Sequence, residues 1–189
     1  MRILIVDDES LIRMDLRDIL ESEQHEVVGE ASNGVEAITM CKELKPDAVL
    51  MDVKMPELDG IEAARQIGFN HLAPVVLLTS YSQQDLVTKA RESGVYGYLI
   101  KPVREEQLIP TLEMAFGRFL DDLESRQQMA DLEKTLEERK IIQKATGILM
   151  DLYKITEDES YNRIRQLSMK KRESMVSICK LIIQQASSS

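Results

Sequence analysis

The sequence contains no tryptophan, only two cysteines and no apolar run approaching the length of a membrane span. A spanning helix needs about 20 consecutive apolar residues, so we expect no contact with the membrane interior. Cys41 and Cys179 lie far apart and lack neighbouring metal-ligand residues, which argues against a disulfide framework or a zinc site. The N-terminal stretch MRILIVDDES is too short and too acidic for a signal peptide. These features predict a cytoplasmic protein.

A glycine-rich phosphate loop is also missing, so a bound nucleotide is not indicated. No catalytic constellation appears after residue 103, which makes an enzymatic output the least expected alternative. What the chain does have is 43% hydrophobic residues, enough for a packed core.

The net charge of −9 is unevenly distributed along the chain. Residues 1–120 carry 21 acids against 12 bases, residues 121–138 carry 7 against 2, and residues 139–189 carry 5 against 10. A basic end on an acidic body favours a polyanion as the partner of that end. Chance variation of surface charge explains the asymmetry about equally well.

Short apolar runs alternate with helical patterns through the first 117 residues. The expected strands are 2–6, 26–31, 47–51, 74–80 and 96–100. The expected helices lie near 10–22, 34–44, 59–68 and 83–92, and a further helix starts near 104. This alternation predicts an α/β fold with a five-stranded parallel doubly wound sheet, whose site forms at the carboxyl ends of the strands.

From Pro102 to about Tyr153 the chain reads as nearly continuous helix. Apolar residues recur on it at spacings of three and four: Leu108, Leu112, Phe116, Phe119, Leu123 and then Met129, Leu132, Leu136. Such a seam predicts a coiled coil with the same helix of a second chain. The alternative is a helix that packs on its own domain, although a helix this long would overshoot it.

The tail predicts three helices. One apolar stripe contains Ala145 and Leu149, Thr156 with Glu159 forms a capping-box pattern, and Ile178 lies in a third stripe. We therefore expect three regions: a phosphoacceptor domain at 1–120, a coiled-coil linker at 121–138 and a small all-α domain at 139–189.

Chemically informative side chains follow the expected strands. Asp7 and Asp8 follow the first strand, Asp52 the third and Lys101 the fifth, while Thr79 ends the fourth. Clustered carboxylates favour a hard divalent cation, and one or two carboxylates with waters and phosphate suit Mg²⁺. A lysine adds a cation for a phosphoryl oxygen. Each residue alone is ordinary, but together they predict a carboxylate that accepts a phosphoryl group.

The pieces ILIVDDE, LMDVKMPELDG, VVLLTSY and GYLIKP closely resemble the receiver domain of two-component response regulators. The resemblance implies that Asp52 is the phosphoacceptor and that Asp7, Asp8, Asp52 and the carbonyl of Lys54 bind Mg²⁺. It also implies a switch pair of Thr79 and Tyr98, with Tyr98 turning inward on phosphorylation, and a cis peptide bond at Pro102 after the phosphate-pairing Lys101. The phosphoryl group would come from a sensor histidine kinase.

The stretch KATGILM, residues 144–150, places a glycine inside a helix, at a cost of about 1 kcal/mol relative to alanine. Close helix packing is one explanation for Gly147, and close approach of a ligand is the other. Lys144 and Thr146 flank it, off the centre of the apolar stripe. Basic residues follow in the next helix, namely Arg165, Lys170, Lys171 and Arg172. A basic surface beside small exposed residues predicts nucleic-acid binding.

KATGILM, the capped second helix and RIRQLSM, after a coiled coil, resemble the ANTAR domain, an RNA-binding antiterminator module, over residues 125–185. That family commonly has lysine where Thr146 stands. The resemblance implies a dimer that binds paired short RNA hairpins and prevents transcription termination, most like regulators of ethanolamine utilisation. A DNA-binding response regulator, or a dimerising receiver with only a protein partner, remains an alternative.

Overall fold

The computed structural model describes residues 1–80 and 94–186, so the helix expected near 83–92 lies outside the described residues. The chain divides into two compact units, Met1–Glu124 and Ser125–Ser189. The finer division into regions 1–120, 121–138 and 139–189 stays a prediction.

Five parallel strands form the sheet of the first unit. They are β1 (Arg2–Val6), β2 (Glu26–Ala31), β3 (Ala48–Asp52), β4 (Val75–Thr79) and β5 (Val95–Ile100), in the order β2-β1-β3-β4-β5. β3 is buried along its whole length, as expected for a central strand covered on both faces. The predicted doubly wound fold is confirmed, with every strand boundary within one residue of its expected place.

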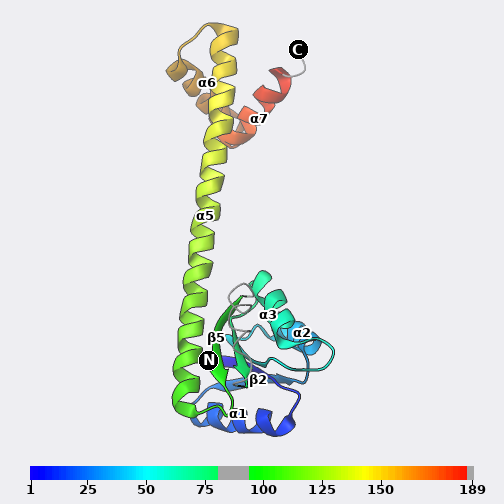
Figure 1. Ribbon diagram of the computed structural model, residues 1–189. Coiled ribbons are helices and arrows are strands. Elements are labelled where there is room, and N and C mark those ends of the chain that lie inside the picture. The colour runs from blue at the N-terminus through cyan, green and yellow to red at the C-terminus, as the bar shows by residue number, and fades with distance from the viewer. Residues whose placement is uncertain (81–93, 187–189) are drawn as a thin grey trace. The chain divides into compact units, whose positions relative to one another are not determined.

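Helices cover both faces of this sheet (Figure 1). The helices α1 (Ser10–Ser22) and α5 (Glu105–Tyr153) enclose one apolar core, which contains Ile5 and Leu50. The helices α2 (Gly34–Leu44) and α3 (Gly60–Phe69) enclose the other, which contains Val49. Because β1 lies between β2 and β3, the strand order reverses there, and a site forms at the carboxyl ends of the neighbouring strands.

The first part of α5 packs on its own sheet, which corrects the predicted seam. Leu108 and Leu112 are fully buried in the core with α1. Phe119 is 7% exposed and meets the ring of Tyr96 edge-on at 5.5 Å between centroids. The early seam residues therefore serve the fold of the first unit, as the alternative interpretation held.

The apolar stripe is uncovered further along α5. Met129, Leu132 and Leu136 are 65%, 62% and 49% exposed. Within the described part of the chain nothing shields them from solvent, so this stretch keeps the pattern of a coiled coil.

In the second unit, the last turns of α5 pack with α6 (Glu157–Lys171) and α7 (Met175–Ala186) around a small core. Ala145, Ile164, Ile178 and Cys179 are its buried members. The capping box of Thr156 and Glu159 begins α6, as predicted. Across residues 1–80 and 94–186, no helix combines the length and apolarity that crossing a membrane requires.

The contrast between two glycines generates a test of the packing beside Asp52. A Cβ on Gly60 would overlap the backbone carbonyl oxygen of Asp52, whereas one on Gly117 would meet no heavy atom within 4 Å among the described residues. We expect Gly60→Ala to lower the free energy of unfolding by about 1–3 kcal/mol through overpacking. Gly117→Ala should raise it by up to about 1 kcal/mol, because alanine favours a helix. Urea unfolding of the full chain measures both, and equal shifts would contradict the packing described.

Candidate functional site

The carboxyl ends of β1, β3 and β5 bring one cation between two carboxylates. Nζ of Lys101 lies 2.7 Å from Oδ2 of Asp7 and 2.6 Å from Oδ1 of Asp52. Asp7 is fully buried and Asp52 is 8% exposed. The parallel sheet produces this meeting, since Asp52 ends β3 while Asp7 and Lys101 directly follow β1 and β5.

Burial raises the pKa of Asp52, and the ion pair with Lys101 acts in the opposite direction. Burial also lowers the pKa of Lys101, but its hydrogen bonds to Asp52 and Asp7 outweigh that effect and raise it above the ordinary value. The ammonium is thus held in its charged form. Two ionised carboxylates and one ammonium leave a net negative charge. That charge would attract an incoming cation, and one of the carboxylates that carry it could act as a nucleophile.

Both carboxylate oxygens of Asp52 have partners. Oδ1 contacts Lys101, and the backbone N–H of Lys54 donates to Oδ2 at 2.9 Å. The backbone N–H of Gly60 donates to the carbonyl oxygen of Val53 at 2.9 Å, which ties the start of α3 to the loop after β3. The Asp52 side chain is therefore oriented by fixed groups.

Arg13 is a residue of this site that the sequence interpretation missed. Its Nη1 donates to the carbonyl oxygen of Asp7 at 2.6 Å, and its Nε pairs with Glu30 at 3.0 Å. The sequence signal for this role was an arginine one turn into the helix that follows Asp7 and Asp8, together with a glutamate near the end of β2. Arg13 fixes the backbone at Asp7 from α1.

Asp8 is exposed and does not join the pair of Asp7 and Asp52. It lines a separate cavity of about 580 Å³ together with Lys54, Met55 and Asp59. In the described ranges, no three His, Cys, Asp or Glu side chains form a group able to hold a metal ion. The three carboxylates therefore do not meet in this structure, where the Lys101 ammonium bridges Asp7 and Asp52, and their assignment as Mg²⁺ ligands stays a prediction.

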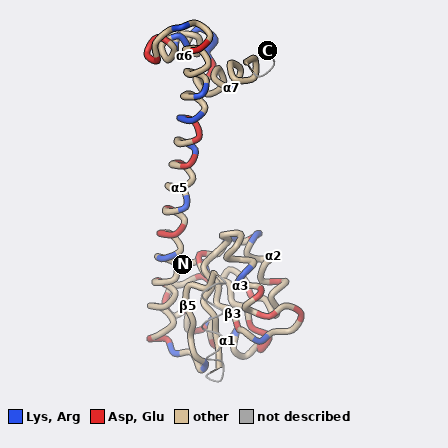
Figure 2. The backbone as a smooth tube through the Cα atoms, turned by 45° about the horizontal axis from the view of Figure 1, so that its top comes forward, with Lys and Arg blue, Asp and Glu red and all other residues tan. Residues whose placement is uncertain are grey.

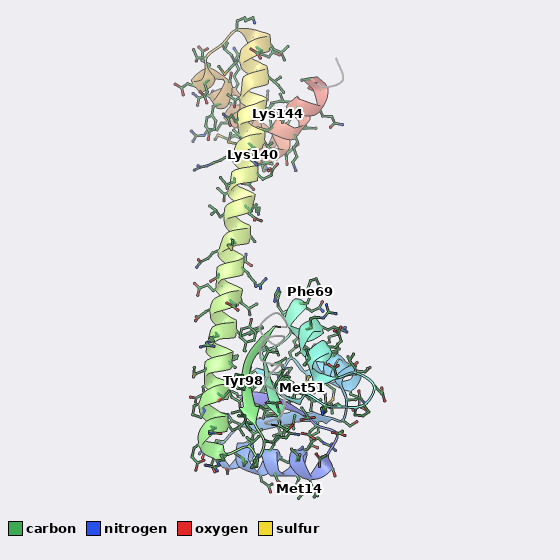
Figure 3. All side chains as sticks on the ribbon, viewed as in Figure 1. Met14, Met51, Phe69, Tyr98, Lys140 and Lys144 are labelled. Atoms are coloured by element: carbon green, nitrogen blue, oxygen red, sulfur yellow. The ribbon has the colours of Figure 1, made fainter. Side chains whose placement is uncertain are left out.

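The residues expected to act as a switch, Thr79 and Tyr98, lie on β4 and β5. Thr79 ends β4, and its hydroxyl donates to the carbonyl oxygen of Ser80 at 3.2 Å. Tyr98 on β5 is 52% exposed (Figure 3). The N–H of Lys101 donates to the carbonyl oxygen of Thr79 at 2.8 Å, and the following peptide bond to Pro102 is cis.

In the second unit, the predicted basic residues lie on the surface. All five, namely Lys144, Arg165, Lys170, Lys171 and Arg172, are exposed. α6 begins with acidic residues and ends with basic ones (Figure 2). A Cβ on Gly147 would meet no heavy atom within 4 Å in the described part of the chain, so packing inside this chain does not explain that glycine.

Thr146 departs from the expectation that it lies on the open surface. It is 4% exposed, because the start of α6 covers this side of α5. Its assignment to an exposed basic surface is therefore wrong, and its contact with RNA stays a prediction.

Comparisons with known proteins match both units. The response regulator receiver domain matches residues 3–113, and the ANTAR domain matches residues 130–183. The transcriptional regulatory protein PdtaR of Mycobacterium tuberculosis is 42% identical over 183 residues, covering 97% of this chain and 89% of its own length.

Solved receiver structures share the fold of the first unit. The response regulator domain of Thermotoga maritima CheB has a TM-score of 0.58 and 32% identity, covering 62% of this chain and 96% of its own. The receiver domain of sensor histidine kinase PA1611 from Pseudomonas aeruginosa has a TM-score of 0.55 and 28% identity, covering 61% and 97%. That structure is described with a magnesium ion coordinated in the active site cleft.

The bridge between Asp7, Asp52 and Lys101 predicts a pH-dependent stability. Lys101→Met removes the cation that counteracts burial, so the pKa of Asp52 in the folded protein rises further above its unfolded value. Stability that depends on a raised pKa is lost as pH increases through that pKa. We expect a deficit in the free energy of unfolding that grows as pH rises above about 4, the ordinary pKa of aspartate, and reaches about 1–3 kcal/mol. This is below the full cost of breaking a buried pair, because Lys101 is partly exposed.

Lys54→Met is the matched control, because only the backbone N–H of Lys54 bonds to Asp52, and its side chain is exposed. Urea unfolding of both variants and the unchanged chain over this pH range measures the difference. Parallel profiles for Lys101→Met and the unchanged chain would contradict the bridge.

Proposed function

Because the chain belongs to the response regulators that join a receiver domain to an ANTAR domain, we propose that it is a phosphorylation-controlled antiterminator that binds RNA hairpins. The observation that carries this proposal is the oriented Asp52 carboxylate beside Lys101, in one chain with an ANTAR domain. Its role is regulatory, with at most self-catalysed phosphotransfer and dephosphorylation. It acts in the cytoplasm, where a sensor kinase and nascent RNA are both within reach.

Asp52 accepts the phosphoryl group from a phosphohistidine of a sensor histidine kinase. A carboxylate oxygen of Asp52 forms a bond to phosphorus as the bond from phosphorus to the kinase imidazole breaks, and the imidazole leaves with that electron pair. The Lys101 ammonium, already 2.6 Å from Asp52, is placed to pair with a phosphoryl oxygen. His25 and His71 of this chain have no part in the transfer.

The oxygen donors around Asp52 fit Mg²⁺. Hard oxygen ligands from one or two carboxylates, with waters and phosphate, suit this ion. The buried Asp7 and Asp52 carry more negative charge than Lys101 neutralises, and Asp8 and the carbonyl of Lys54 lie at the adjacent loops. We assign Asp7, Asp8, Asp52 and the Lys54 carbonyl as its ligands. The ion would neutralise charge on the phosphoryl oxygens.

Thr79 and Tyr98 transmit the new charge. In the structure the Thr79 hydroxyl donates to the neighbouring Ser80 carbonyl. When the hydroxyl turns toward the phosphoryl group, it exchanges this neutral acceptor for a charged one. Tyr98 then turns from its exposed position toward the space left by Thr79. β5 leads directly into α5, so this rearrangement acts at the start of the long helix.

The uncovered stripe of Met129, Leu132 and Leu136 serves as the dimer seam. A second copy of the same helix is its natural partner, since heptad-like apolar spacing matches itself. Phosphorylation promotes this dimer. Two tails then bind two hairpins, and the paired hairpins prevent a terminator from forming.

Lys144, Arg165, Lys170, Lys171 and Arg172 supply RNA phosphate contacts. Gly147, with open space around it, lets the RNA backbone approach α5. The target genes are those of ethanolamine utilisation, as the sequence resemblance implies. A DNA-binding or purely protein-binding tail is the alternative, and comparing full-chain binding to hairpin RNA and to duplex DNA separates the three.

The first functional prediction concerns Asp52. Asp52→Asn should abolish labelling by a small phosphodonor in the presence of Mg²⁺, because an amide cannot replace the carboxylate nucleophile. The fold should survive, since asparagine has nearly the same volume. Labelling is measured by intact mass, with Asp18→Asn, which changes an exposed acid of α1, as a control that still accepts phosphate. Undiminished labelling of Asp52→Asn would overturn the assignment.

The second functional prediction concerns the seam. Leu132→Glu with Leu136→Glu should keep the phosphorylated chain monomeric by placing like charges on the stripe. Phe119 is unsuitable for this test, because it packs against Tyr96. Met14→Glu, at an exposed methionine of α1, is the control that should still dimerise. Light scattering with and without phosphodonor measures the mass, and an unchanged dimer in the double variant would contradict the seam.

The third functional prediction concerns Lys144 and Gly147. Lys144→Gln should weaken binding to every hairpin and reduce the salt slope by roughly 0.7, the value per phosphate contact on single strands. Gly147→Ala should raise the free energy of unfolding by up to about 1 kcal/mol and weaken RNA binding, because its Cβ lies in space that the RNA enters. A more stable Gly147→Ala chain that binds RNA normally would remove this glycine from the interface.

A further inference from the structure

Every polar group of Asp7 has a hydrogen-bond partner, and these partners come from different parts of the first unit. The backbone N–H donates to the carbonyl oxygen of Ala31 on β2 at 3.1 Å. In the side chain, Oδ1 accepts from the N–H of Glu9 at 3.0 Å, and Oδ2 contacts Lys101. The carbonyl oxygen accepts from Nη1 of Arg13 at 2.6 Å. Arg13 is thus the partner that fixes the peptide bond leading out of Asp7.

This peptide bond determines where the next acid lies. A peptide unit is planar, so the direction of the Asp7 carbonyl also sets the direction in which the chain continues to Asp8. In the described part of the chain, the Asp8 side chain has no hydrogen bond or ion pair that holds it independently. It lines the same cavity of about 580 Å³ as Lys54. The orientation of one peptide therefore decides whether Asp8 faces the side of the site where the Lys54 backbone lies.

The guanidinium of Arg13 is itself held in place. Its Nε donates to Oε2 of Glu30 at 3.0 Å, and Nη2 of Arg17 donates to the other oxygen of the same carboxylate at 2.6 Å. The hydrogen bonds from Arg17, which has the larger influence, and from Arg13 lower the pKa of Glu30 despite its partial burial. This carboxylate therefore stays ionised. Because the fork of the guanidinium is planar and rigid, fixing its Nε also directs its Nη1 at Asp7.

A tether between α1 and β2 is the simpler role for Arg13. Arg17 has this role through the same Glu30, and it pairs with Glu21 as well at 3.2 Å. Ion pairs that are partly exposed contribute little to stability. A tether also needs no contact with Asp7, and among the described residues Arg17 makes no such contact. The bond from Arg13 to the Asp7 carbonyl is the observation that a tether does not explain.

We propose that Arg13 is a positioning residue of the phosphoacceptor site, which orients the peptide between Asp7 and Asp8 and thereby sets the affinity of the site for Mg²⁺. The inference rests on the proposed function, in which Asp7 and Asp8 are ligands of that ion. Mg²⁺ requires near-octahedral geometry with short oxygen distances, so it tolerates little misplacement of a carboxylate. Groups that orient metal ligands without touching the metal typically change the affinity by about 10- to 100-fold when they are replaced.

The charge of Arg13 and its hydrogen bond predict opposite effects on the binding of this ion. A cation near the site repels Mg²⁺, so removing the charge alone would strengthen binding. Removing the hydrogen bond frees the peptide and weakens binding. Arg13→Lys separates the two influences, because lysine keeps the charge but lacks the planar fork that reaches Glu30 and the Asp7 carbonyl together.

The test measures the Mg²⁺ affinity of the full, unphosphorylated chain by following its backbone amide NMR signals during a titration with MgCl₂. The N–H groups of Glu9 and Lys54 are suitable reporters, because they donate to the carboxylates of Asp7 and Asp52. Arg13→Met and Arg13→Lys should both raise the dissociation constant for Mg²⁺ about 10-fold or more.

Arg17→Met is the matched control, because it removes an equal charge from the same Glu30 without altering a contact of Asp7. Its dissociation constant for Mg²⁺ should stay close to that of the unchanged chain. Labelling by a small phosphodonor gives a second measurement. Arg13→Lys should need about 10-fold more Mg²⁺ to reach half of its maximal rate, whereas the maximal rate at saturating Mg²⁺ should be retained.

Each outcome has a definite meaning. Equal Mg²⁺ affinities for Arg13→Met, Arg17→Met and the unchanged chain overturn the positioning role and leave the phosphoacceptor function intact. Tighter binding by Arg13→Met, with Arg13→Lys unchanged, assigns Arg13 an effect of charge alone and also overturns the positioning role. The absence of any Mg²⁺-dependent shift in the unchanged chain overturns the proposed metal site together with this inference. Arg13→Lys keeps a cation between α1 and β2, so it tests the proposal even where Arg13→Met fails to fold.

Discussion

The ammonium of Lys101 between the carboxylates of Asp7 and Asp52 is the interaction on which the first unit depends. Without a cation, two ionised carboxylates at the end of a buried sheet would repel each other and lose hydration that nothing replaces. The lysine resolves that conflict and orients Asp52 at the same time. It also leaves one negative charge uncompensated, which is the electrostatic basis for the cation and the phosphoryl group proposed to bind here. Stability and reactivity here have the same electrostatic origin.

The strands and the meeting of Asp7, Asp52 and Lys101 could be predicted because they follow from local pattern and parallel topology. A short apolar run such as Ile3–Val6 fits a buried strand, and parallel strands bring their carboxyl ends to one edge. The position of the Lys101 ammonium could not be predicted in this way. Whether a flexible lysine or a metal ion lies between two acids depends on side-chain conformation, which spacing does not encode.

The errors on α5 have a related cause. Periodicity identifies which face of a helix is apolar but not what covers that face. Leu108 and Leu112 face their own sheet, whereas Leu132, with similar spacing, is open to solvent. Thr146 was placed on the surface because it lies beside the apolar stripe, and the crossing of α6 buried it. In both cases the missing information was a tertiary contact between segments distant in the sequence.

The uncovered stripe on α5 also affects how the output would vary with the signal. Leu132 and Leu136 stay in water until another copy arrives, so covering them is a bimolecular event. If the stripe is the proposed dimer seam, the amount of dimer rises with the square of the concentration of phosphorylated chains while these are scarce. Doubling a weak stimulus would then increase the RNA-competent species about fourfold. A protein with this seam would form little dimer at a low level of phosphorylation, and its dimer would increase steeply once its kinase is active.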